Sequence, residues 1–239
     1  MNYKLQFKNI CNIIAKTFRY NLKIMFANWF FIFLLIAIAI FLIWTILTLV
    51  NSDSNPTEGS VYTLLYFTGI LLIAYPTIFG IQNDVDSRMI EILFGIPNYR
   101  YKVWLVRLGI IYLVVFGMLM ILCFLCSITM VTVPVVDMVF QLMFPIFFLG
   151  CLAFMFSTII RDGFGTGVVM IIIVVIFLFI NEVLPPQFRL FMNPFTVPSD
   201  VNEAVWAEAT FNNRIYLLIG MFINVLFGLL NLQKREKFV

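Results

Sequence analysis

Long apolar stretches separated by short polar segments make up most of the chain. A helix needs about 20 consecutive apolar residues to cross the hydrocarbon core of a bilayer, which is about 30 Å thick. Six stretches approach or exceed this length, and their apolar cores contain no Asp, Glu, Lys or Arg. We therefore predict an all-α integral membrane protein with six transmembrane helices. The predicted spans cover approximately residues 29–50, 61–81, 103–132, 138–160, 164–181 and 215–232.

The composition favours the same class. Hydrophobic residues make up 63% of the 239 residues and charged residues only 11%, whereas soluble domains have roughly 45–50% apolar and about 25% charged residues. This difference excludes a soluble globular domain. The chain has no His, which removes His-based acid–base catalysis and most zinc sites. The four Cys do not form the pattern of a secreted disulfide framework.

The distribution of charge predicts the orientation. If the N-terminus is cytoplasmic, thirteen of the fifteen Lys and Arg residues lie on the cytoplasmic side, and only Arg189 and Arg214 lie outside. This asymmetry follows the positive-inside rule. We therefore expect a multi-pass protein of the cell membrane (plasma or inner membrane), with both termini cytoplasmic. The basic segments are expected to contact lipid headgroups, and nothing indicates a nucleic-acid partner.

Two cytoplasmic segments have helical amphipathic patterns. Residues 1–28 predict an interface helix that precedes a single six-span domain over residues 29–239, with a merely basic tail as the alternative. Between spans two and three, Asp84 and Asp86 can cap a short helix that Gly95 and Pro97 end. Its apolar face consists of Met89, Ile90, Leu93 and Phe94. Such an apolar face is expected to be buried against the membrane surface, the helix bundle or a soluble partner.

Several single features have local interpretations. Pro76 is expected to kink span two, and Gln141 and Asn224 are expected to form hydrogen bonds between helices. The glycines at 163, 165 and 167 predict a tight turn between spans four and five. Residues 181–214 predict an outer segment of short amphipathic helices or a re-entrant piece. Cys123 and Cys126 share a helix face, so Cu(I) binding is possible, although apolar packing is the more common role.

The sequence also lacks the residues that would power transport. Ion-coupled carriers usually keep ionisable side chains inside the bilayer, and the predicted apolar cores have none. No G-x-x-x-x-G-K-[ST] phosphate-binding loop is present. We therefore expect no catalytic residue and no metal or cofactor site in this chain, and any transport must draw its energy from a partner.

The segment after span two resembles that of the ABC-2 type transporter permeases. In that family the segment reads roughly E-R-E-x-G-T-L-E-x-L-x-x-x-P-x-S-R, followed by a basic residue ten positions after the Pro. Five residues of this chain fall in register with it, and Arg88 and Tyr99 replace the family's Gly and Ser. Asn193-Pro194-Phe195 is similar to a Pro-aromatic outer segment of the family. The matching residues are Glu91, Leu93, Pro97, Arg100 and Arg107.

The resemblance implies a membrane subunit of an ATP-driven exporter. Residues 84–100 would form a coupling helix that docks on an ATP-binding subunit, present in two copies, and the turn at 161–165 would make a second contact. ATP and Mg would then bind to that partner. A second permease subunit, identical or homologous, would complete a dimer. The residues assigned to ATPase coupling are Arg88, Glu91, Leu93, Phe94, Pro97, Arg100 and Arg107.

The residues fit these roles physically. An apolar helix face can seat in a groove of a partner, and Glu91 can pair with Arg88 or with a base of the partner. Arg100, Lys102 and Arg107 are expected to contact inner-leaflet phosphates. A translocation path lined by the abundant Phe, Leu, Ile and Met side chains would suit an apolar or amphiphilic cargo, such as a lipid, peptide or drug-like molecule. The alternatives are a lipid-modifying enzyme, with Glu182, Asp200, Glu203 and Glu208 as outer-loop candidates, and a non-transporting membrane scaffold.

Overall fold

The computed structural model describes residues 30–50, 56–86, 100–181, 183–199 and 201–232. All regular structure within these ranges is helical. The predicted amphipathic segment 1–28 lies outside the described residues, as do residues 87–99 of the predicted coupling helix. The elements are α2 (Phe30–Val50), α3 (Glu58–Ile78), α4 (Gly80–Asp86), the π-helical turn η1 (Arg100–Leu105), α6 (Val106–Thr129), α7 (Val135–Ile160), α8 (Gly163–Ile180), the 3-10 turn η2 (Pro186–Phe188) and α9 (Glu203–Asn231).

Five helical stretches among the described residues are long and apolar enough to cross a membrane. This confirms the all-helical class and is consistent with a multi-pass membrane protein, while the predicted number of six spans stays a prediction. The helix α2 is apolar as well, and its stretch Leu34–Thr48 is shorter than these five. The five stretches are Glu58–Asn83, Val103–Thr129, Val135–Ile160, Gly163–Ile180 and Glu203–Asn231.

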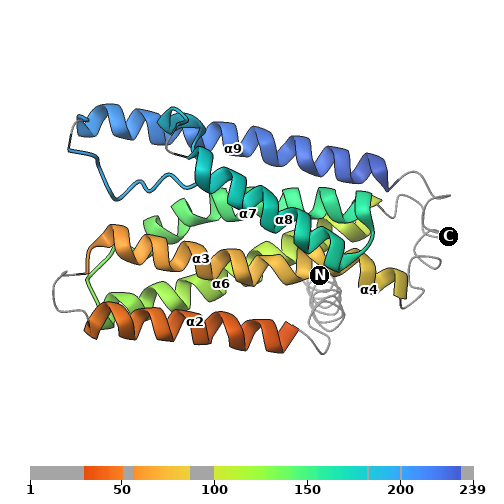
Figure 1. Ribbon diagram of the computed structural model, residues 1–239, viewed down its shortest axis with the longest axis horizontal. Helices are drawn as coiled ribbons and strands as arrows, with labels where there is room; N and C mark the ends of the chain where they lie inside the picture. The colour runs from red at the N-terminus through yellow and green to blue at the C-terminus, as the bar shows by residue number, and fades with distance from the viewer. Residues whose placement is uncertain (1–29, 51–55, 87–99, 182, 200, 233–239) are drawn as a thin grey trace, which may run out of the picture.

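The helices lie side by side with their axes roughly along the long axis of the molecule, and α2 and α9 lie on opposite sides (Figure 1). The centre of the bundle is formed by α3 and α7, which are mostly buried, whereas only a minority of α8 is. The helix α7 packs on α3, α6, α8 and α9. Its inward side chains Leu142 and Ile146 are fully buried with Leu65 and Leu119. Burial of such side chains from both neighbours stabilises the bundle around α7.

Pro76 lies in the last turn of α3, shortly before a one-residue break in the helical stretch at Phe79. Proline has no N–H to donate to the carbonyl four residues earlier, and its ring clashes with that carbonyl. The helix α3 ends at Ile78, two residues beyond Pro76, and α4 resumes at Gly80. The Thr77 hydroxyl donates to the Ile73 carbonyl of the preceding turn at 2.7 Å.

Residues 203–214, which were expected to belong to an outer segment of short amphipathic helices or a re-entrant piece, form the first turns of the long helix α9. The helix begins where the side chain of Asn202 accepts a hydrogen bond from the Ala204 N–H, and Glu203 adds a favourable charge in its first turn. The apolar run starts only at Ile215 because these first turns are polar, but the helix itself begins at Glu203. The last helix is therefore longer than the predicted span.

Candidate functional site

Most of the predicted coupling residues fall outside the described part of the chain. Arg88, Glu91, Leu93, Phe94 and Pro97 lie within residues 87–99. The chain approaches this segment through α4 and leaves it through η1, where the backbone of Arg100 begins the turn. The structure thus places the two ends of the segment and leaves its predicted helix untested.

Arg107 is buried in the bundle, so the expectation that it contacts inner-leaflet phosphates is wrong. Its side chain is only 5% exposed, and its guanidinium carbon lies 4.7 Å from the centre of the Trp104 ring. The two residues are three positions apart and share one face of the helix. That face packs against Ile81 and Phe154, so Arg107 makes a cation–π contact inside the protein rather than a contact with lipid.

The α3–α4 junction is fastened to the turn between α7 and α8. The Ser157 hydroxyl donates to the Ile78 carbonyl at 2.9 Å, and the Gly163 N–H donates to Gln82 Oε1 at 2.6 Å. A methyl group on Gly163 would lie 2.3 Å from Phe79 Cδ1, so only glycine allows this close approach. The predicted tight turn is present, but of its three glycines Gly163 makes the close approach to the α3–α4 junction, whereas a methyl group on Gly167 would meet no atom within 4 Å.

This turn reverses the chain in two residues. Arg161 adopts the left-handed conformation, with φ 63°, and Asp162 caps α8 by accepting a hydrogen bond from the Gly165 N–H. Phe164 follows and is 73% exposed, while its ring meets the ring of Phe79 edge to face at 5.5 Å. The turn at 161–165 and α4, which leads into residues 87–99, therefore lie at the same end of the bundle. We call this end the α4 end.

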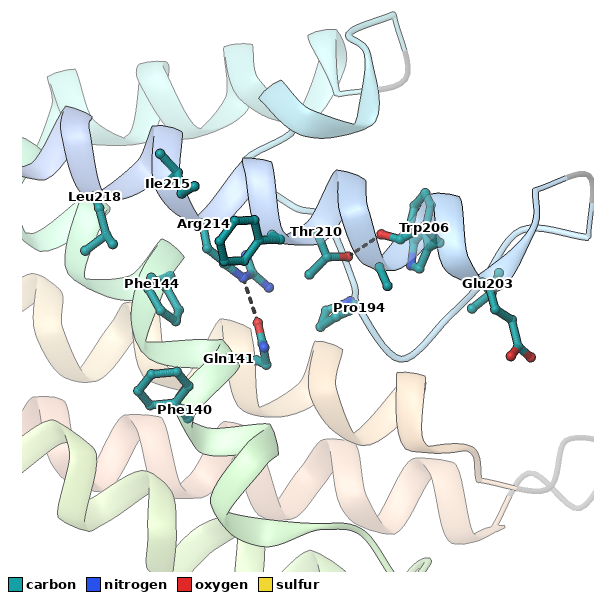
Figure 2. Close-up of a pocket in the computed structure, with 13 residues that line it drawn as sticks. Phe140, Gln141, Phe144, Pro194, Glu203, Trp206, Thr210, Arg214, Ile215 and Leu218 are labelled. Carbon is teal, nitrogen blue, oxygen red and sulfur yellow. Dashed lines mark hydrogen bonds between the residues drawn. The ribbon is translucent and has the colours of Figure 1, made fainter.

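A cavity of about 530 Å³ lies at the opposite end, between α7, α9 and the segment that precedes α9. Its walls are mainly apolar, with Arg214 and Gln141 as polar groups near its centre (Figure 2). Pro194 forms part of one edge, and the neighbouring Asn193 amide donates to the Gly59 carbonyl at 2.9 Å. The segment Asn193-Pro194-Phe195 is thus held between the start of α3 and the cavity.

Arg214 is held by three neutral side chains from three helices. Its Nε–H donates to Gln141 Oε1 of α7 at 2.8 Å, one terminal nitrogen donates to Asn213 Oδ1 at 2.9 Å, and the other to the Tyr62 hydroxyl of α3 at 3.2 Å. Asn213 in turn donates to the carbonyls of Gln187 and Arg189 around η2. The guanidinium is therefore fixed between α3, α7, α9 and the outer segment.

The predicted interhelical role of Gln141 is confirmed by this network, whereas Arg214 was expected in an outer loop. The structure instead buries Arg214, at 5% exposure, within α9. A sequence signal does exist. Trp206, Thr210, Asn213 and Leu217 recur at helical spacing and are all buried. That pattern continues the inward face of α9 toward its N-terminus past the end of the apolar run. Asn224 is buried on the same helix.

The network predicts a measurable loss of stability. Replacing Gln141 with leucine is expected to lower the free energy of unfolding by about 1–3 kcal/mol, because it leaves the buried Nε–H of Arg214 without its acceptor. Thermal or denaturant unfolding in detergent measures the effect. The control is Thr129→Val, because the exposed Thr129 hydroxyl bonds only to the Leu125 carbonyl of its own helix, and it should change stability by about 0.5 kcal/mol or less. Equal stability of the two variants would contradict the proposed role of Gln141.

The sulfur-bearing side chains of α6 are part of the core. Cys123 and Cys126 are fully buried, and the Cys123 thiol faces the Val135 carbonyl at 4.0 Å. Within the described ranges, no group of three or more His, Cys, Asp or Glu side chains gathers in a way that could hold a metal ion. Their described environment is that of buried apolar filler.

In comparisons with known proteins, no family model, no curated protein and no solved structure matches the chain.

Proposed function

We propose that this protein is the permease subunit of an ATP-driven exporter of the ABC-2 type, and that a separate subunit binds and hydrolyses ATP. In this proposal α2 is a sixth membrane crossing, both termini are cytoplasmic, and the α4 end faces the cytoplasm. The observation that carries the proposal is the register of Glu91, Leu93, Pro97 and Arg100 with the family's coupling segment. That segment lies between α4 and η1 at the end of the bundle where α4 is fastened to the α7–α8 turn.

The described contacts give a route by which a docked ATPase would act on the bundle. A displacement of residues 87–99 would pull on α4, and the bond from Gly163 to Gln82 would pass it to the start of α8. The bond from Ser157 to the Ile78 carbonyl would pass it to the end of α7. The contact segment at 84–100 and the one at 161–165 would therefore move together.

The helix α7 extends this route to the other end of the bundle. It has 26 residues, which corresponds to about 39 Å of helix. Its far part carries Gln141, which holds Arg214 beside the cavity. Pro145, four residues after Gln141, cannot donate to the Gln141 carbonyl, so α7 has a point at which it can bend. Nucleotide-driven movement at the α4 end would thus reach the residues that line the cavity.

Co-purification tests the proposal directly. The full chain, tagged at its C-terminus and expressed in its native host, is expected to carry with it an ATP-binding subunit that hydrolyses ATP. A tagged unrelated six-span protein from the same membrane is the control for adventitious capture. Full export activity in a host that lacks every ATP-binding cassette subunit would contradict the proposal, as would activity of the isolated chain without ATP.

A further inference from the structure

The cavity contains a buried cation that no described carboxylate neutralises. Arg214 donates hydrogen bonds to two side-chain amides and a phenol, and it forms no ion pair with a described Asp or Glu. Burying a charge within an apolar helix is costly, and an ionisable residue inside a membrane bundle generally marks a functional site. An anion would complete the charge balance of this site.

The guanidinium has donors left to bind one. An arginine has five N–H bonds in a planar fork, and the bonds to Gln141, Asn213 and Tyr62 use three of them. The two that remain, one on each terminal nitrogen, can donate to the oxygens of a phosphate or a carboxylate. Glu203 cannot take this role, because it lies eleven residues away on the same helix, about 16 Å along its axis. It stands at the far end of the cavity in Figure 2.

The rest of the cavity suits an apolar tail. Rings of Phe140, Phe144, Trp206 and Phe211 line it. Phe140 and Phe211 are 57% and 66% exposed, and they stand on helices apolar enough to cross a membrane. The cavity is therefore open on this side, and the open side is apolar. The volume of about 530 Å³ falls in the range of small-molecule sites, roughly 300–1,000 Å³.

We infer that this cavity binds an amphiphile with an oxyanion headgroup, a phosphate or a carboxylate held by Arg214, whose apolar tail lies along the aromatic wall. An anionic membrane lipid and a soluble anionic amphiphile share this chemistry. The binding does not require an ATPase, so it is measured on the isolated chain. Its failure would leave the proposed coupling at the α4 end untouched.

The unmodified protein gives the first test. The full chain in an uncharged detergent is titrated calorimetrically with n-octyl phosphate, inorganic phosphate, n-octanol and octyltrimethylammonium. Octyl phosphate is expected to bind at least about tenfold more tightly than octanol or the cation, because only it satisfies the guanidinium. It should also bind more tightly than inorganic phosphate, which lacks the tail. Equal affinity for octyl phosphate and for the uncharged or cationic analogue would overturn the inference.

Variants assign the binding to this cavity. Arg214→Gln is expected to weaken octyl phosphate binding by about tenfold or more. Arg161→Gln removes the same charge at the α4 end, away from the cavity, and should bind as the unmodified chain does. If Arg214→Gln does not fold, Ala207→Trp fills the cavity from an exposed position on α9 and leaves the Arg214 bonds in place. Unchanged binding by Arg214→Gln or by Ala207→Trp would overturn the inference.

A competition experiment separates the two sources of the oxyanion. Phosphatidylglycerol that displaces octyl phosphate from the chain, and that remains bound in native mass spectra of the purified protein, identifies the ligand as a membrane lipid. Octyl phosphate binding that phosphatidylglycerol does not displace identifies a soluble amphiphile. Either result supports an oxyanion site, and an absence of binding by both anions would refute it.

Discussion

Replacing Leu93 and Phe94 together with alanine is expected to abolish ATP-driven export while leaving the protein in the membrane. These side chains form much of the predicted apolar face of the coupling helix, and the loss of two buried anchors at an interface costs about 3 kcal/mol, or roughly 150-fold in affinity. The ATPase subunit should then no longer co-purify. ATP hydrolysis in the membranes should also become independent of the transported substrate.

The matched control for this change lies on α9. Leu226 and Phe227 are an adjacent Leu–Phe pair, 57% and 61% exposed on the outside of the bundle. Replacing both with alanine removes the same atoms and should leave ATPase binding and export nearly unchanged. If the two double variants export equally well, residues 93 and 94 do not couple the permease to an ATPase.

Replacing Gly163 with alanine is expected to destabilise the protein by about 3 kcal/mol. The new methyl group would lie within 2.3 Å of Phe79 Cδ1 and 2.5 Å of Gln82 Oε1. Such overpacking typically costs about 1–3 kcal/mol, and displacing Gln82 also breaks its bond with the Gly163 N–H, for about another 1 kcal/mol. The measurement is the unfolding temperature in detergent together with substrate-stimulated ATPase activity, and both are expected to fall.

Gly167→Ala is the control, because a methyl group at Gly167 meets no atom within 4 Å. Alanine has the higher helix propensity, so this change should leave stability unchanged or raise it by up to about 1 kcal/mol. A Gly163→Ala protein that unfolds at the same temperature as Gly167→Ala would contradict the close packing of the α3–α4 junction against the α7–α8 turn. A stable Gly163→Ala protein with normal coupling would also remove this junction from the proposed route.

The membrane helices could be predicted from the sequence because the bilayer imposes a simple rule of length and polarity. That rule finds the apolar part of a helix and not its ends. It placed the last span at 215, whereas α9 continues back to a capping residue, Asn202, through turns that are polar on the outside. The start of α7 shows the same effect, since it begins at Val135, right after Pro134, rather than at 138.

The candidate site was harder to predict, because its partners are far apart in the sequence. Gln141 was expected to bond to another helix, but no local pattern shows that its partner is Arg214, 73 positions away. The contact of Arg214 with Tyr62 spans 152 positions. The environment of Arg107 was predicted wrongly even though its partner is close in the sequence. Its position beside a basic loop suggested a lipid contact, whereas the aromatic ring at Trp104 provides a buried partner one turn away.

The most direct test of the proposed function is a photo-crosslink from position 94. A photoreactive amino acid replaces Phe94 in the full chain, and intact cells are irradiated with and without trapping of the ATPase in its nucleotide-bound state. A covalent adduct with an ATP-binding subunit, whose yield changes with the nucleotide state, is the expected result. Adducts with phospholipid alone, in cells where the chain still exports its substrate, would contradict the proposal that residues 87–99 transmit the work of an ATPase.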